Sequence, residues 1–257
     1  MGFNNLPCQL QKAFHSQSLL KIISGLNNFD KYSVERISRA GRAGGADLLD
    51  VACDPELVKL AASESDLPIC VSAVEPKKFI PAISAGAVMA EIGNFDSFYK
   101  QGRFFDASEV LQLTIETRLL LPDVFLSVTV PHTIPLDKQS QLALDLVTAG
   151  ADCIQTEGGK IASPSSAGVL GLIEKAAPTL SATYAISKAL KMSNCQIPVL
   201  SASGLTSVTI PMAIASGASG VGVGSAVSLL KEELAMVASI RSMKEACSAK
   251  KTLNTMA

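Results

Sequence analysis

One short phrase occurs four times in this chain, and its repetition constrains the fold more than any other feature of the sequence. Each copy consists of a small residue, then Gly-Ala, then a short run that is mostly apolar. Glycine adopts the left-handed conformation that closes many helices at their C-termini. Each copy therefore predicts the end of a helix followed by a strand. The copies are AGGADLLDVA (43–52), SAGAVMAEIG (84–93), TAGADCIQTE (148–157) and ASGASGVGVG (215–224).

A second set of short apolar strands precedes the four copies, and stretches with helical spacing separate the strands. The chain of 257 residues then holds eight strands alternating with helices, at about 31 residues per unit, which is typical of a (β/α)8 barrel. A doubly wound open sheet has the same alternation, but no GxGxxG turn follows the first strand. The extra strands are predicted at 19–25, 67–73, 124–130 and 197–203, and the clearest helices at 108–121 and 136–149.

We therefore predict a single-domain α/β protein, a (β/α)8 TIM barrel. Residues 1–18 are expected to be an N-terminal extension that packs on the barrel. Residues 19–240 would form the barrel, and 241–257 the C-terminal helix end and tail. The hydrophobic content of 48% is sufficient for a sizeable core. The net charge of −1, with scattered basic residues, argues against nucleic acid as a partner. No apolar run reaches the length of a membrane span. The six cysteines show no metal-ligand spacing and are interpreted as free thiols.

The ends of the last two strands predict a phosphate site. Barrels that bind phosphate use the loops after strands seven and eight together with the N-terminus of a short helix. Glycines there let backbone N–H groups approach phosphate oxygens, and the helix end adds positive potential. The alternative is that these glycines only serve tight turns. The predicted cup, in which Ser225 would also be the helix N-cap, consists of Ser203, Gly204, Gly222, Gly224 and Ser225.

The repeat also predicts which side chains face the barrel centre. Residues alternate along a strand, so equivalent positions of the four copies should share one orientation. Asp50, Glu91 and Gln155 are predicted to point inward in one layer, where most barrels pack aliphatic residues. A buried carboxylate is unfavourable unless it is paired or protonated. These residues therefore form either a structural hydrogen-bond network or carboxylates that line a site.

Three further residues are candidates for chemistry at the mouth. Glu157 ends the third copy and is expected at the rim, facing the phosphate cup. Lys160 lies on the glycine-rich loop that follows, where it could clamp an anion or form a Schiff base, or simply be solvated. His132 follows the fifth strand and is either a proton carrier or a surface residue.

The loop at 94–102 combines polar groups with three aromatic residues. Such a loop could stack on a flat ligand or dock against a partner, including a second copy of this chain. It could equally fold its own aromatic rings onto the barrel rim.

Five segments of the sequence are long enough to be specific: ISGLNNFD (23–30), LPICVSAVEP (67–76), EIGNFDSFYKQG (91–102), VTVPHT (128–133) and IQTEGG (154–159). Together they resemble a family of plastid and cyanobacterial proteins, the hypothetical chloroplast reading frame numbered twenty-three. This resemblance implies a barrel of the ribulose-phosphate-binding type in the plastid stroma or the cyanobacterial cytoplasm, and it brings no established activity. The cup is more loosely similar to thiazole synthase, tryptophan-pathway isomerases and sugar-phosphate epimerases. Thiazole synthase keeps a Schiff-base lysine inside its barrel, and no matching lysine is identified from this sequence.

The first functional hypothesis is an enzyme of the isomerase or lyase type that acts on a small phosphorylated metabolite. Its acid–base candidates are Glu157, His132, Asp50 and Glu91, with Lys160 as a clamp. The second hypothesis is a non-catalytic sensor or assembly partner that binds such a metabolite. The third is an FMN-binding barrel, since the same cup fits the phosphate of FMN; the sequence requires no cofactor.

Overall fold

The computed structural model describes residues 2–158 and 162–254 of the chain. Within these residues, eight parallel strands form a closed barrel in which each strand pairs with the next and β8 pairs with β1. The predicted fold is therefore confirmed. The strands are β1 (Leu19–Ile23), β2 (Leu48–Ala52), β3 (Ile69–Ala73), β4 (Met89–Ile92), β5 (Phe125–Val130), β6 (Cys153–Thr156), β7 (Val199–Ala202) and β8 (Gly220–Val223).

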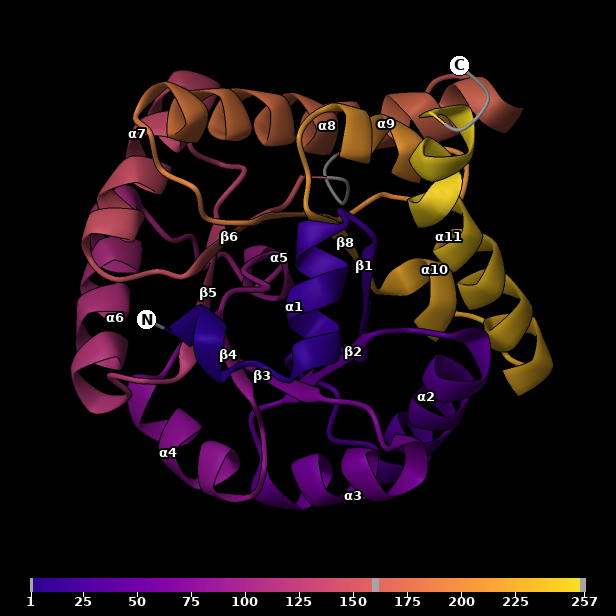
Figure 1. Cartoon of the computed structure of the whole chain (residues 1–257), viewed down its shortest axis with the longest axis horizontal. Helices are drawn as coiled ribbons and strands as arrows, with labels where there is room; N and C mark the ends of the chain where they lie inside the picture. Colours follow the sequence, from indigo (N-terminus) through magenta and orange to yellow (C-terminus); the bar gives the residue numbers. More distant parts are fainter. Residues whose placement is uncertain (1, 159–161, 255–257) are drawn as a thin grey trace.

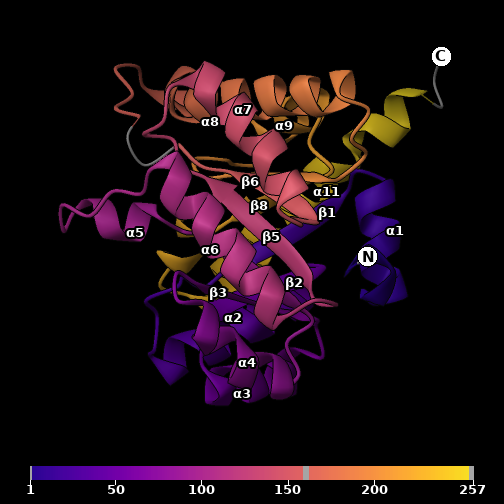
Figure 2. The ribbon, with the colours of Figure 1, turned by 90° about the vertical axis from the view of Figure 1, so that its left-hand side faces the viewer.

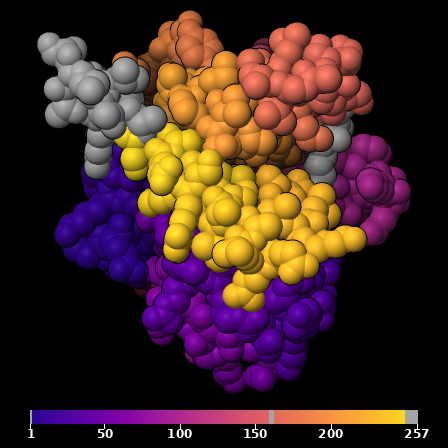
Figure 3. Space-filling model, turned by 90° about the vertical axis from the view of Figure 1, so that its right-hand side faces the viewer, coloured from indigo at the N-terminus to yellow at the C-terminus, as the bar shows by residue number. Residues whose placement is uncertain are grey.

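Helices surround the strands as a ring (Figure 1). The two helices that the sequence marked most clearly, α6 and α7, begin and end within one residue of their predicted bounds. The last helix packs against α2 and α9, and Figure 3 shows it in yellow across that side of the molecule. It runs without a break past residue 240, where the sequence had placed the end of the barrel. The ring consists of α2 (Lys31–Gly44), α3 (Pro55–Ser65), α4 (Pro76–Ser84), α6 (Ala107–Leu120), α7 (Leu136–Thr148), α8 (Gly168–Met192), α9 (Ile210–Ala215) and α11 (Glu233–Asn254).

The repeated glycines have the conformation that the repeat predicted. Gly45, Gly86, Gly150 and Gly217 all have φ between 84° and 114° and stand between a helix and the strand that follows it. A side chain would be strained in this left-handed region. At Gly217 the close approach of α8 adds a second reason, because a Cβ there would lie 2.7 Å from the Cβ of Ser187.

The alternation of side chains along the even strands also follows the prediction. Val51, Ile92 and Val223 are buried in the core between the strands and the helices. Thr156, the equivalent residue of β6, contacts Thr183 of α8 through its hydroxyl group. The neighbouring positions of each strand therefore point into the barrel.

The N-terminal end of the barrel is closed by α1 (Cys8–His15). Leu10 and Phe14 of this helix pack onto the lowest layer of interior side chains, which includes Leu19, Met89 and Phe125. Figure 2 shows α1 at one end of the barrel and the short helix α5 (Asp96–Tyr99) at the opposite end. The carboxyl ends of the strands, where barrels carry their sites, lie at the end that α1 leaves uncovered. No helix of the described residues is long and apolar enough to cross a membrane.

Candidate functional site

A cavity of about 430 Å³ lies at the carboxyl ends of the strands. The loops after β7 and β8 form one side of its lining, and the rest comes from the end of β1 and its loop, from β5 and β6 and from the loop after β4. All five residues of the predicted phosphate cup line this cavity: Ser203, Gly204, Gly222, Gly224 and Ser225.

The loop after β7 has an unusual backbone. Ser203 has a φ of 80° and Gly204 a φ of 73°, so both residues are left-handed. A non-glycine residue in this region is strained, and such strain persists only where the surroundings hold it. Here the hydroxyl group of Thr179 on α8 donates to the carbonyl oxygens of Ala202 (3.2 Å) and Ser203 (2.8 Å).

Three backbone N–H groups of the cup, those of Gly204, Gly224 and Ser225, make no backbone hydrogen bond among the described residues. The prediction that Ser225 is the helix N-cap is wrong. Gly224 holds the N-cap position of the short helix α10 (Ser225–Ser228), and its φ of −112° and ψ of −87° start the helix one residue earlier than expected.

Glu157 lies directly after β6, lines the cavity and is only 4% exposed. Its Oε1 atom accepts hydrogen bonds from the hydroxyl group of Tyr99 and from the backbone N–H of His132 (3.1 Å), and it lies 3.0 Å from Nδ1 of His132. Burial and the charge of Glu157 raise the pKa of Tyr99, so its phenol stays protonated as a donor. Oε2 of Glu157 and Nε2 of His132 are buried and have no hydrogen-bond partner among the described residues.

One buried charge beneath the cavity, that of Lys21, was not predicted from the sequence. Lys21 on β1 is 0% exposed and points into the barrel, where its Nζ lies 2.5 Å from Glu91 and 3.6 Å from Asp50. Burial disfavours the ammonium form, but the charges of Glu91 and Asp50 outweigh burial and hold the pKa of Lys21 above its usual value. The signal was present in the sequence, because strict alternation along Leu19–Ile23 points Lys21 to the same side as its neighbours two residues away.

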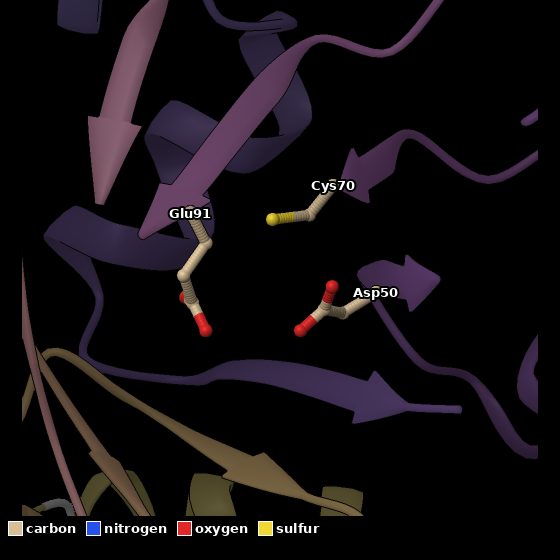
Figure 4. A group of neighbouring side chains, drawn as sticks. All are labelled: Asp50, Cys70 and Glu91. Atoms are coloured by element: carbon tan, nitrogen blue, oxygen red, sulfur yellow. The ribbon is translucent and has the colours of Figure 1, made fainter. Parts of the chain in front are cut away.

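Figure 4 shows Asp50, Glu91 and Cys70 pointing toward one another inside the barrel. Their possible ligand atoms lie within 4.8 Å of one another, as in many metal sites. Here the ammonium group of Lys21 already supplies a positive charge to both carboxylates. Burial raises the pKa of the Cys70 thiol well above its usual range, and a protonated thiol is a poor metal ligand. We therefore interpret this group as a buried ion-pair network.

The predicted inward orientation of Asp50, Glu91 and Gln155 is confirmed, and Gln155 donates to Glu91 at 2.6 Å. Asp50 and Glu91 nevertheless do not line the cavity, and Asn94 and Gln155, which contact them, do. Of the predicted acid–base residues, Glu157 lines the cavity and His132 stands directly behind it. Lys160 lies outside the described residues.

The aromatic residues of the 94–102 loop fold onto the rim. Phe95 is buried with its ring centre 4.5 Å from that of Phe105, and Phe98 also packs on Phe105. Tyr99 stacks on Phe104 and meets His132 edge-on. The loop thus uses its rings to hold the Tyr99 hydroxyl on Glu157. A docking role for this loop stays a prediction.

Asp50→Asn is expected to flatten the pH dependence of stability. Burial raises the pKa of Asp50 from 3.8 to about 6, with Glu91 adding to the effect and Lys21 opposing it. The folded state then holds this proton more tightly than the unfolded state, so the free energy of unfolding falls as the pH rises from about 4 to about 6. The variant should gain about 3 kcal/mol relative to the parent between pH 4 and pH 7. Urea unfolding at each pH measures this difference, and parallel curves for the two proteins would contradict it.

The chain is similar in sequence to one protein family and in fold to several solved structures. The family described as "Protein of unknown function (DUF561)" matches residues 4–253. A relative from Cyanophora paradoxa, described as "Uncharacterized protein ycf23", is 47% identical over 191 residues, which are 74% of this chain and 76% of that protein. The fold is similar to that of (S)-3-O-geranylgeranylglyceryl phosphate synthase from Thermoplasma acidophilum, solved in complex with its substrate sn-glycerol-1-phosphate. That match has a TM-score of 0.62 and 13% identity and covers 95% of this chain and 100% of the other. Thiamine phosphate pyrophosphorylase from Pyrococcus furiosus matches with a TM-score of 0.58 and 16% identity, over 91% and 97% of the two chains.

Proposed function

This chain belongs to the DUF561 family, and we propose that it binds a small phosphorylated metabolite at the barrel mouth and acts on it as an isomerase or lyase. One observation carries the proposal. The same cavity is lined by the glycine loops after β7 and β8 and by Glu157, whose second carboxylate oxygen is buried without a partner. A phosphate held by the loops would place the carbon chain of its ester across the mouth, next to this oxygen.

The chemistry at Glu157 would be proton transfer. Tyr99 and the backbone of His132 hold Oε1, so the carboxylate is fixed in orientation and its Oε2 is left unpaired among the described residues. Oε2 would take a proton from the substrate, and the imidazole of His132 beside Oε1 would stabilise the protonated carboxyl group or accept that proton from it. The solved barrels with this fold include enzymes named for phosphorylated compounds, which supports the same substrate class. The relative from Cyanophora paradoxa supports the plastid or cyanobacterial setting that the resemblance implies.

A second candidate, a sensor of the same metabolite, is favoured by one observation. Asp50 and Glu91 are bound to Lys21 beneath the cavity, so two of the four acid–base candidates are not available to a ligand. Only Glu157 and His132 remain at the mouth. Mass spectrometry of the molecule that co-purifies with the protein would identify the ligand for both candidates, and a yellow protein would indicate FMN. Turnover of that ligand would then separate the enzyme from the sensor.

Gly224→Val is expected to abolish stabilisation by inorganic phosphate. A Cβ at this position would lie 3.5 Å from the carbonyl oxygen of Ile23, which is an ordinary contact, so the barrel should still fold. The two methyl groups of valine would occupy the space through which phosphate approaches the N–H groups of the cup. In the parent protein, phosphate at about 100 times its Kd should raise the free energy of unfolding by about 2.7 kcal/mol and raise the melting temperature accordingly.

Gly86→Ala is the matched control for this experiment. Gly86 has a φ of 114° and precedes β4, at the end of the strands away from the cup. Alanine there should lower the melting temperature through backbone strain but leave the rise caused by phosphate intact. The same rise in Gly224→Val as in the parent would remove the cup from the proposal.

A further inference from the structure

The buried ion-pair network determines which way an amide on the cavity floor points. Nε2 of Gln155 donates to Oε1 of Glu91 at 2.6 Å and to the hydroxyl oxygen of Thr129 at 3.2 Å. A carboxylate accepts hydrogen bonds, and Glu91 is paired with the ammonium group of Lys21 at 2.5 Å. The amide NH2 must therefore face down onto Glu91. Oε1 of Gln155 then faces the other way, and it is buried without a partner among the described residues.

Asn94 repeats this arrangement on the same floor. Its Nδ2 donates to the hydroxyl of Ser72 (3.0 Å) and lies at 3.4 Å from Glu91 and 3.5 Å from Asp50. Asn94, Gln155 and Glu157 all line the cavity, and Oε1 of Gln155 and Oε2 of Glu157 are buried without a partner among the described residues. The floor therefore offers two unpaired hydrogen-bond acceptors.

Gly222 keeps one of these acceptors open. A Cβ at this position would lie 3.4 Å from Oε1 of Gln155, close above the amide. Gly222 is also one of the cup residues, at the end of β8 and two positions before Gly224. The acceptor floor and the phosphate cup are therefore adjacent, and one small molecule can reach both.

We propose that the carbon chain of the ligand carries at least two hydroxyl groups that donate to this floor, so that the ligand is a polyol phosphate or sugar phosphate. This inference rests on the proposed phosphate site and concerns the carbon chain that is attached to the phosphate group of the ligand. Buried acceptors that are left without a donor are unfavourable, so a floor of this kind rejects analogues that lack the hydroxyl groups. An alkyl phosphate fills the same space but leaves the acceptors unpaired.

Titration calorimetry with four probes tests the floor separately from the cup. Inorganic phosphate and propyl phosphate report on the cup alone, whereas glycerol 3-phosphate and ribose 5-phosphate add hydroxyl donors. We expect the hydroxylated esters to bind at least about tenfold more tightly than propyl phosphate. Equal affinity of propyl phosphate and the hydroxylated esters would overturn the acceptor floor while leaving the phosphate site in place. Failure of every phosphate compound to bind would overturn the proposed function and this inference with it.

Gly222→Ala tests the same point from the side of the protein. The added methyl group would cover Oε1 of Gln155 while leaving the amide and its bond to Glu91 in place. It is expected to reduce the preference for hydroxylated esters to about twofold or less and to leave the affinity for inorganic phosphate within a few-fold. If the variant keeps the parent protein's preference for hydroxylated esters, the proposed acceptor floor is wrong. Because the methyl group also comes within 3.0 Å of Ala202, the ligand comparison in the parent protein stands as the test if this variant does not fold.

Discussion

Lys21→Met is expected to lower the free energy of unfolding by about 3–5 kcal/mol. Methionine has a similar length and fits the barrel interior, but it leaves Glu91 and Asp50 buried without their cation. Removing one member of a buried ion pair is strongly destabilising, because the remaining charge can neither be solvated nor neutralised at no cost. Denaturant unfolding at pH 7 measures the loss.

Two comparisons show whether the loss comes from the unpaired charge. Lys244→Met removes an ion pair with Asp47 that is partly exposed to solvent, and it should lower stability by about 1 kcal/mol or less. Adding Glu91→Gln to Lys21→Met removes one of the two unpaired carboxylates and should restore part of the lost stability. Equal losses in the two lysine variants would show that the buried network contributes no more than a surface pair.

Glu157→Gln is expected to reduce turnover of the phosphorylated substrate by roughly a hundredfold or more, with ligand affinity changed by only a few-fold. Glutamine keeps the shape of the side chain and an oxygen that can accept from Tyr99 and from the backbone of His132. It replaces the free carboxylate oxygen with an amide that cannot take a proton. Steady-state kinetics and calorimetry with the ligand that co-purifies would measure the two effects.

Glu116→Gln is a suitable control, because Glu116 lies on α6 and bonds only to Gln112 at the surface in the described structure. It should leave turnover unchanged. Full activity in Glu157→Gln would transfer the role of base to His132. If the parent protein and both variants show no turnover of a ligand that they bind, the sensor is the better description.

The inward placement of Asp50, Glu91 and Gln155 could be predicted because all three occur at the same position of a repeated phrase. Lys21 could not be found in this way, since β1 belongs to the other set of strands and carries no copy of the phrase. Its position on the same face of β1 as Leu19 and Ile23 was a usable signal. A lone lysine in an apolar strand nevertheless gives no indication of which charged residues will pair with it. The pairing depends on Glu91, which is 70 residues away in the chain.

The barrel, the order of its elements and the loops that form the cup could be predicted from the sequence, because they depend on local properties: the two-residue alternation of strands, the helical period and the glycines at helix ends. Which polar residues line the cavity depends on the tertiary structure. Asp50 and Glu91 lie outside the lining of the cavity, in contact with Asn94 and Gln155, whereas Glu157 meets Tyr99 and His132 at the mouth. Closure of the barrel arranges all eight strands around one axis, and the distances between side chains inside it are set by strand register and side-chain length, which no single segment encodes.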